Sequence, residues 1–159
     1  MAICILGLIA LGWYMTELTP EQGRHDFYFW HKSFGVLVMV LLPIRMALRH
    51  YTFIPPLPRD IKPIEKKASH AGHILLYVLM TAVPVIGYVF SSSGGYDVPF
   101  FGPVLPNIIG KHKWLFDISR EAHEISAYTL LGMVALHIAG ALKHRFFEKP
   151  ENDVLNRMV

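Results

Sequence analysis

The sequence predicts an all-α fold, a bundle of four helices that spans a membrane. Of its 159 residues, 53% are hydrophobic and only 17% are charged, whereas a soluble domain carries about 25% charged residues. The charges are gathered in short stretches between long apolar ones, which is typical of a chain folded in lipid. A soluble bundle would have too little polar surface to cover its helices. We therefore interpret residues 1–159 as a single transmembrane domain.

Four apolar segments define the expected helices, and they cover residues 1–15, 28–48, 71–91 and 122–142. The last three reach the roughly 20 residues needed to cross about 30 Å of hydrocarbon. The first segment is shorter and has neither a cap nor a flanking charge. It also lacks the basic start and cleavage site of a signal peptide. We interpret it as the outer part of a helix, and we expect residues upstream of Met1 to supply the rest.

The connections and two internal prolines complete the expected architecture. Pro43 and Pro84 fall inside the second and third segments, where membrane helices tolerate proline. Residues 53–58 read as an extended linker, and residues 91–99 as a turn-rich connection. Residues 113–120 are expected to form a short separate helix at the membrane interface.

Lysine and arginine are distributed unequally between the two sides of this topology. The side that holds the 49–69 loop and the C-terminus carries ten of the fifteen: Arg45, Arg49, Arg59, Lys62, Lys66, Lys67, Lys143, Arg145, Lys149 and Arg157. The other side carries five: Arg24, Lys32, Lys111, Lys113 and Arg120. Because basic residues are retained on the cytoplasmic side, we expect the first side to be cytoplasmic.

Histidine is the unusual residue type, with nine in the chain. His123 and His137 lie 14 residues apart on the fourth segment. On a helix this spacing places them within about 40° of each other and about 21 Å apart along the axis. One helix face therefore offers an imidazole near each side of the membrane, which suits two stacked haems.

His31 lies near the outer end of the second segment, at the depth expected for His123. The two can bind one iron from opposite sides, and two neutral imidazoles are typical axial ligands of an electron-transfer haem. Gly35 is four residues from His31 on the same face, where a flat macrocycle needs close approach to the backbone. The alternative is that each histidine only bonds a helix carbonyl or marks the headgroup boundary.

The remaining polar residues of the helices admit two interpretations each. His70, His73 and His144 can ligate iron, hold propionates or move protons for a quinone, or they can be interfacial polar residues. Arg45 and Arg49 either snorkel to the headgroups or pair with a haem propionate. We expect His25, His50 and His112 to lie at the surface, and Cys4 to be a packing or lipid-facing residue.

Several motifs together resemble the bacterial cytochrome b561 family over almost the whole chain. They are His31-Lys-Ser-Phe-Gly35 followed by Arg45, Arg49 and Pro55-Pro56; Ser69-His-Ala-Gly-His-Ile-Leu-Leu-Tyr77 continuing to Pro84-Val-Ile-Gly87; and His123-Glu, His137 and His144. The resemblance implies an inner-membrane protein with two b-type haems. It implies that His31 and His123 are the axial pair of the outer haem and that His137 is one ligand of the inner haem. The other inner ligand is expected upstream of Met1, which leaves that site incomplete here, with His70 or His73 as weaker substitutes.

The resemblance also implies an activity, because members exchange electrons with ubiquinone and one oxidises superoxide. We therefore expect electron transfer from a periplasmic donor, superoxide or a redox protein, to membrane quinone. Lys111, Lys113 and Arg120 can steer an anion or contact lipid headgroups. The alternative is a passive conduit or membrane anchor for a separate dehydrogenase or periplasmic redox partner. A transporter that uses the histidines is disfavoured, since the one acidic residue of the four apolar segments, Glu124, lies near a segment end and an inverted repeat is lacking. No nucleic-acid partner is expected.

Overall fold

Four helices make up most of the protein, as the sequence predicts. The computed structural model describes residues 1–52 and 61–147, so the expected Pro55-Pro56 linker, Arg59 and the tail with Lys149 and Arg157 lie outside the described residues. The elements in order are α1 (Ala2–Glu17), the 3-10 turn η1 (Pro20–Gln22), α2 (Arg24–Tyr51), α3 (Pro63–Ser93), β1 (Val98–Pro99), β2 (Val104–Leu105) and α4 (Lys113–Phe146).

Three of these helices are long and apolar enough to cross a membrane. They are α2, α3 and α4, with 28, 31 and 34 residues, whereas α1 is a shorter apolar helix of 16 residues. The long helices extend past the apolar segments at both ends, because their polar flanks continue the same backbone hydrogen bonding. Pro43 and Pro84 lie inside α2 and α3, as predicted.

The expected separate interfacial helix at residues 113–120 does not exist. These residues are the first turns of α4, which runs unbroken from Lys113. The sequence there has no glycine or proline to end a helix, and Ser119 donates its hydroxyl to the carbonyl oxygen of Leu115 inside the same helix. Trp114 remains largely exposed in this first turn.

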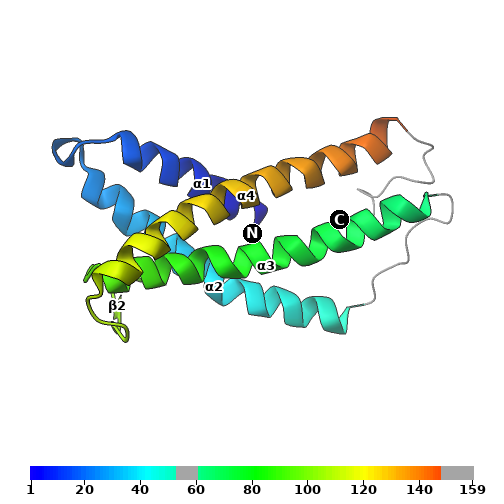
Figure 1. Ribbon diagram of the computed structural model, residues 1–159. Helices are drawn as coiled ribbons and strands as arrows, with labels where there is room; N and C mark the ends of the chain where they lie inside the picture. The colour runs from blue at the N-terminus through cyan, green and yellow to red at the C-terminus, as the bar shows by residue number, and fades with distance from the viewer. Residues whose placement is uncertain (53–60, 148–159) are drawn as a thin grey trace.

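The helices are arranged as an elongated bundle (Figure 1). α3 and α4 run antiparallel and pack against each other along most of their length, and α2 packs on both α1 and α3. The α1–α2 turn, the end of α3 and the start of α4 lie at one end, which we call the hairpin end. The chain begins near mid-length, so α1 accompanies the other helices over the hairpin half only.

All four helices contribute to the core, which lies at the middle of the bundle. Its buried residues are Ile5 from α1, Val38 from α2, Leu76 and Leu79 from α3, and Leu130 from α4. Outside this layer many large apolar side chains are exposed, among them Leu48, Val78, Ile125 and Leu136. An apolar exterior around a small core is what a protein surrounded by lipid requires.

A small β-hairpin occupies the connection between α3 and α4, where the sequence led us to expect only turns. β1 and β2 pair antiparallel, with Val98 opposite Leu105 and Pro99 opposite Val104. The turn between them uses Phe101 with φ 54° and Gly102 with φ 144°. The hairpin is held to α2 by Ser33, whose buried hydroxyl donates to the Pro99 carbonyl at 3.3 Å and accepts from the Phe101 amide at 3.1 Å.

The end of α3 is a run of three buried serines, Ser91 to Ser93. Their backbone carbonyls accept from the loop that follows: Tyr96 N–H bonds to Ser91, Asn107 Nδ2 to Ser92 and His112 N–H to Ser93. The last carbonyls of a helix have no partner within the helix. The hairpin loop supplies those partners and is thereby fixed over this end of the bundle.

Candidate functional site

His31 from α2 and His123 from α4 face each other at the hairpin end. Their ring centres are 6.3 Å apart and the rings are nearly perpendicular, at 86°. A metal–nitrogen bond of about 2.0 Å and about 1.1 Å from a ring nitrogen to the ring centre put two imidazoles on one metal about 6.2 Å apart between centres. The separation of the two rings therefore suits one iron bound between them.

His123 is oriented by a hydrogen bond to α3. Its Nδ1 lies 3.0 Å from the Val83 carbonyl oxygen, so the protonated nitrogen donates there and Nε2 keeps its lone pair. A metal-binding histidine usually donates its other N–H to a carbonyl in this way, which fixes the tautomer and the ring direction. The Nδ1 of His31 faces α1, where Gly12 and the backbone of Leu8 lie near it.

Each imidazole rests against a glycine of a neighbouring helix. A Cβ added at Gly87 of α3 would lie 2.9 Å from Cε1 of His123, and one added at Gly12 of α1 would lie 3.1 Å from Cε1 of His31. The sequence placed Gly87 in a motif but did not predict that it makes room for an imidazole, and it did not single out Gly12. Only the spatial neighbour of each glycine reveals why a side chain is absent there.

A pocket opens beside the two rings and is lined mainly from α2, α3 and α4. Its lining includes His31, Gly35, Gly87, Tyr88 and His123. A Cβ added at Gly35 would meet no atom within 4 Å, so the backbone there faces open space that a flat ring can approach. With the facing imidazoles and the bare backbone at Gly35, this pocket fits a haem.

A second histidine pair lies toward the other end of the bundle. His73 of α3 and His137 of α4 have ring centres 5.3 Å apart at 62°, which is closer than two ligands of one iron. Arg49 lies near this pair, 5.8 Å above the Tyr77 ring and within electrostatic reach of His73. Met1, the residue before α1, packs at the central core, and α1 contains no histidine.

The other residues selected from the sequence are less closely grouped. Arg45 and His70 are exposed, and His144 is partly buried about two turns beyond His137. His25, His50 and His112 are exposed, as expected. Over residues 1–52 and 61–147 no group of three or more His, Cys, Asp or Glu side chains could hold a metal ion, and the histidines described above come in pairs.

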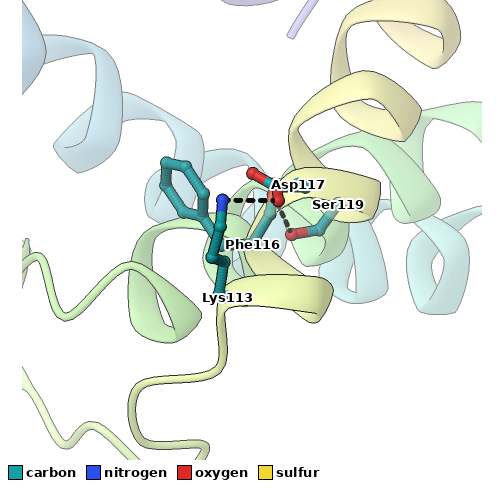
Figure 2. Close-up of polar contacts among 4 residues, drawn as sticks. All are labelled: Lys113, Phe116, Asp117 and Ser119. Atoms are coloured by element: carbon teal, nitrogen blue, oxygen red, sulfur yellow. Dashed lines mark hydrogen bonds and ion pairs between the residues drawn. The ribbon is translucent and has the colours of Figure 1, made fainter.

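The cations expected to steer an anion differ in their surroundings. Lys113 is paired with Asp117 at 3.1 Å in the first turn of α4, beside the Ser119 hydroxyl that bonds back into the helix (Figure 2). Arg120 is exposed. Lys32, which the sequence did not single out for this role, follows His31 and lines the pocket.

Facing imidazoles on apolar helices, beside a pocket, are typical of membrane cytochromes. Proteins of this class bind b-type haem between their helices. A profile of the family described as prokaryotic cytochrome b561 matches residues 1–159 of the chain. The chain belongs to the prokaryotic cytochrome b561 family, and it is accordingly an integral membrane protein that binds b-type haem and transfers electrons. The family resemblance found in the sequence is thus confirmed.

Curated relatives cover nearly all of the chain. It is 34% identical over 161 residues to "Cytochrome b561 homolog 2" of Escherichia coli (strain K12), covering 99% of this chain and 84% of that protein. It is 26% identical over 157 residues to the "Probable superoxide oxidase CybB" of Yersinia pestis, covering 97% of this chain and 89% of that protein.

Proposed function

We propose that this cytochrome passes electrons from a donor at the hairpin end of the bundle to quinone in the membrane. The observation that carries the proposal is the 6.3 Å separation of the His31 and His123 rings beside an open pocket. Bound there, haem would supply a one-electron carrier that cycles between ferric and ferrous iron. His31 and His123 would hold the iron, with His123 kept in its tautomer by the Val83 carbonyl.

The second haem of the proposed pathway involves His137. The 14-residue spacing places this imidazole about 21 Å along α4 from His123, on nearly the same face. α3 and α4 are packed together where His73 meets His137, so a macrocycle between those two rings would force the helices apart. We therefore assign His137 the role of ligand and His73 that of a polar neighbour, able to hold a proton for quinone. Arg49, near His73, is suited to a propionate or a quinone oxygen, and Arg45 and His144 are weaker candidates for the same roles.

Superoxide is the donor we favour, because a relative that covers nearly the whole chain is named a probable superoxide oxidase. Superoxide would give up one electron and leave as dioxygen, and two such electrons with two protons would convert a quinone to a quinol. Lys111 and Arg120 are exposed cations at the hairpin end and can draw an anion to that end. The donor side is then periplasmic, and the opposite end faces the cytoplasm.

Ligand variants test the haem assignment. His31→Ala and His123→Ala should each lose the six-coordinate, low-spin spectrum of one haem, because one axial nitrogen is gone. The measurement is the optical spectrum of purified protein together with the haem-to-protein ratio. His25→Ala, at an exposed position of the same end, is the control. Unchanged spectra and haem content in both ligand variants would refute the assignment.

Stopped-flow mixing tests the donor. Superoxide should reduce the haem directly, and a quinone analogue should re-oxidise it. The reduction rate should fall with added salt, since screening weakens attraction between an anion and surface cations. A preparation that dithionite reduces and superoxide does not would contradict a superoxide donor and favour a conduit for another protein.

A further inference from the structure

Lys32 is a cation built into the wall of the haem pocket. It directly follows His31 and lines the same pocket. Its ammonium donates to the Asp97 backbone carbonyl at 2.8 Å and lies 5.5 Å from the centre of the Tyr96 ring. Both partners belong to the loop that covers the end of α3, so this loop determines where the charge sits.

The contacts of Lys32 satisfy one of its N–H donors and do not include an ion pair among the described residues. An ammonium has three N–H donors, and the carbonyl of Asp97 uses one of them. Among the described residues, no carboxylate oxygen lies within the 4.0 Å ion-pair distance of Nζ, although the Asp97 carboxylate is near enough to act electrostatically. A partly buried charge is costly without an opposite charge beside it.

The ligand expected in this pocket brings such a charge. Haem carries two propionate carboxylates at one edge, and it becomes more negative by one unit when its iron is reduced. A fixed cation beside it stabilises the reduced form more than the oxidised form, by Coulomb attraction in a medium of low dielectric. Hydrogen bonding, charge and burial around a haem are known means of setting its reduction potential.

We propose that Lys32 pairs with a propionate of the outer haem and, held by the Tyr96–Asp97 segment, raises the reduction potential of that haem. The inference rests on the proposed function, because it needs a haem between His31 and His123. An alternative is that Lys32 only snorkels toward the headgroups. Its position in the pocket wall, under a carbonyl and a ring from a separate segment, argues against a free, solvent-seeking side chain.

Redox titration of the haem-loaded protein tests the proposal. Lys32→Gln should lower the midpoint potential of the outer haem. At a fixed applied potential the ratio of reduced to oxidised haem should fall about tenfold, which corresponds to a shift of about 59 mV for one electron. Lys32→Arg keeps the charge and should stay near the parent value. Lys113→Gln removes a charge at the same end that is already paired with Asp117, and it should change the potential little.

A second readout addresses the propionate itself. In resonance Raman spectra, the propionate bending band should shift in Lys32→Gln and not in Lys113→Gln. If Lys32→Gln does not accumulate, Tyr96→Leu replaces it, because this change loosens the ammonium without removing it and should lower the potential less. A low-spin haem with unchanged potential and band in Lys32→Gln, or an unchanged potential in Tyr96→Leu, would overturn the inference and leave the axial assignment intact. An error in the assignment of His31 and His123 as ligands would instead appear as unchanged spectra and haem content in the His31→Ala and His123→Ala variants.

Discussion

Single atoms decide how the two facing imidazoles are held. Gly12 and Gly87 let the His31 and His123 rings lie against the backbones of α1 and α3, at distances where a methyl group would crowd His31 and displace His123. The Val83 carbonyl then fixes which nitrogen of His123 is free. Ring position and tautomer are thus set by the neighbouring helices and not by α2 and α4 alone.

Gly87→Ala should weaken haem binding at the outer site. Its methyl group would sit 2.9 Å from Cε1 of His123 and push the ring off its line to the iron and to Val83. Disturbing groups that orient a metal ligand costs on the order of tenfold or more in affinity. Haem titration of the apo-protein measures the effect. Gly132→Ala is the matched control, because its added Cβ meets nothing within 4 Å. Equal affinities for the two variants would contradict the role of Gly87.

At the scale of elements, the β-hairpin is the piece that ties the helix ends together. It accepts and donates hydrogen bonds at Ser33 of α2, and its loop satisfies the last carbonyls of α3. Tyr88 of α3 adds a hydrogen bond to the Pro106 carbonyl at 2.6 Å. The hairpin and its loop therefore link α2 to α3 next to the haem pocket.

Ser33→Ala should loosen the attachment of the β-hairpin to α2 without unfolding the helices. It would leave the Pro99 carbonyl and the Phe101 amide without the partner they share, at a cost of about 1–3 kcal/mol for buried groups. Hydrogen exchange of the Phe101 amide should accelerate accordingly. Thr129→Ala removes an exposed hydroxyl that bonds only within its own helix and should leave that amide unchanged. The same protection in both variants would show that Ser33 does not hold the hairpin.

The sequence predicts those features that are local along the chain. Helix identity follows from apolar length, and the relation of His123 to His137 follows from the helical repeat, since both lie on α4. The hairpin was missed because its strands have two residues each and depend on Ser33, 66 residues away from Pro99. Gly12 and Lys32 were missed for the same reason, because their partners come from other elements. The continuation of α4 through residues 113–120 was missed because polarity was taken as a boundary where no helix breaker exists.

At the scale of the whole molecule, two ends of different composition are separated by an apolar exterior. The hairpin end carries the ordered loop and the His31–His123 pair, and the opposite end carries the His73–His137 pair. Near that opposite end Lys143 of α4 also pairs with Glu65 of α3 at 2.7 Å. Among residues 1–52 and 61–147, that end carries seven lysines and arginines and the hairpin end carries five, an asymmetry that we expect to orient the chain across a membrane.

Reporter fusions should reveal that direction. An alkaline phosphatase attached after residue 159 should be inactive and a fluorescent protein at the same point should be bright, because the basic end stays in the cytoplasm. A phosphatase inserted at Gly102, in the hairpin turn, should be active. Active phosphatase at the C-terminus would reverse the orientation and with it the side from which electrons enter.

The buried layer of Ile5, Val38, Leu76, Leu79 and Leu130 has an electrical consequence. Leu130 is seven residues from His123 and seven from His137, so this layer lies midway between the two histidine pairs. Its side chains are aliphatic and cannot carry a proton. An electron that passes it moves as an uncompensated charge, and the work is about 2.3 kcal/mol per 100 mV for a full crossing. The voltage of the cell would then act directly on turnover. Energised vesicles, negative inside, should reduce quinone more slowly than the same vesicles after an ionophore collapses the voltage.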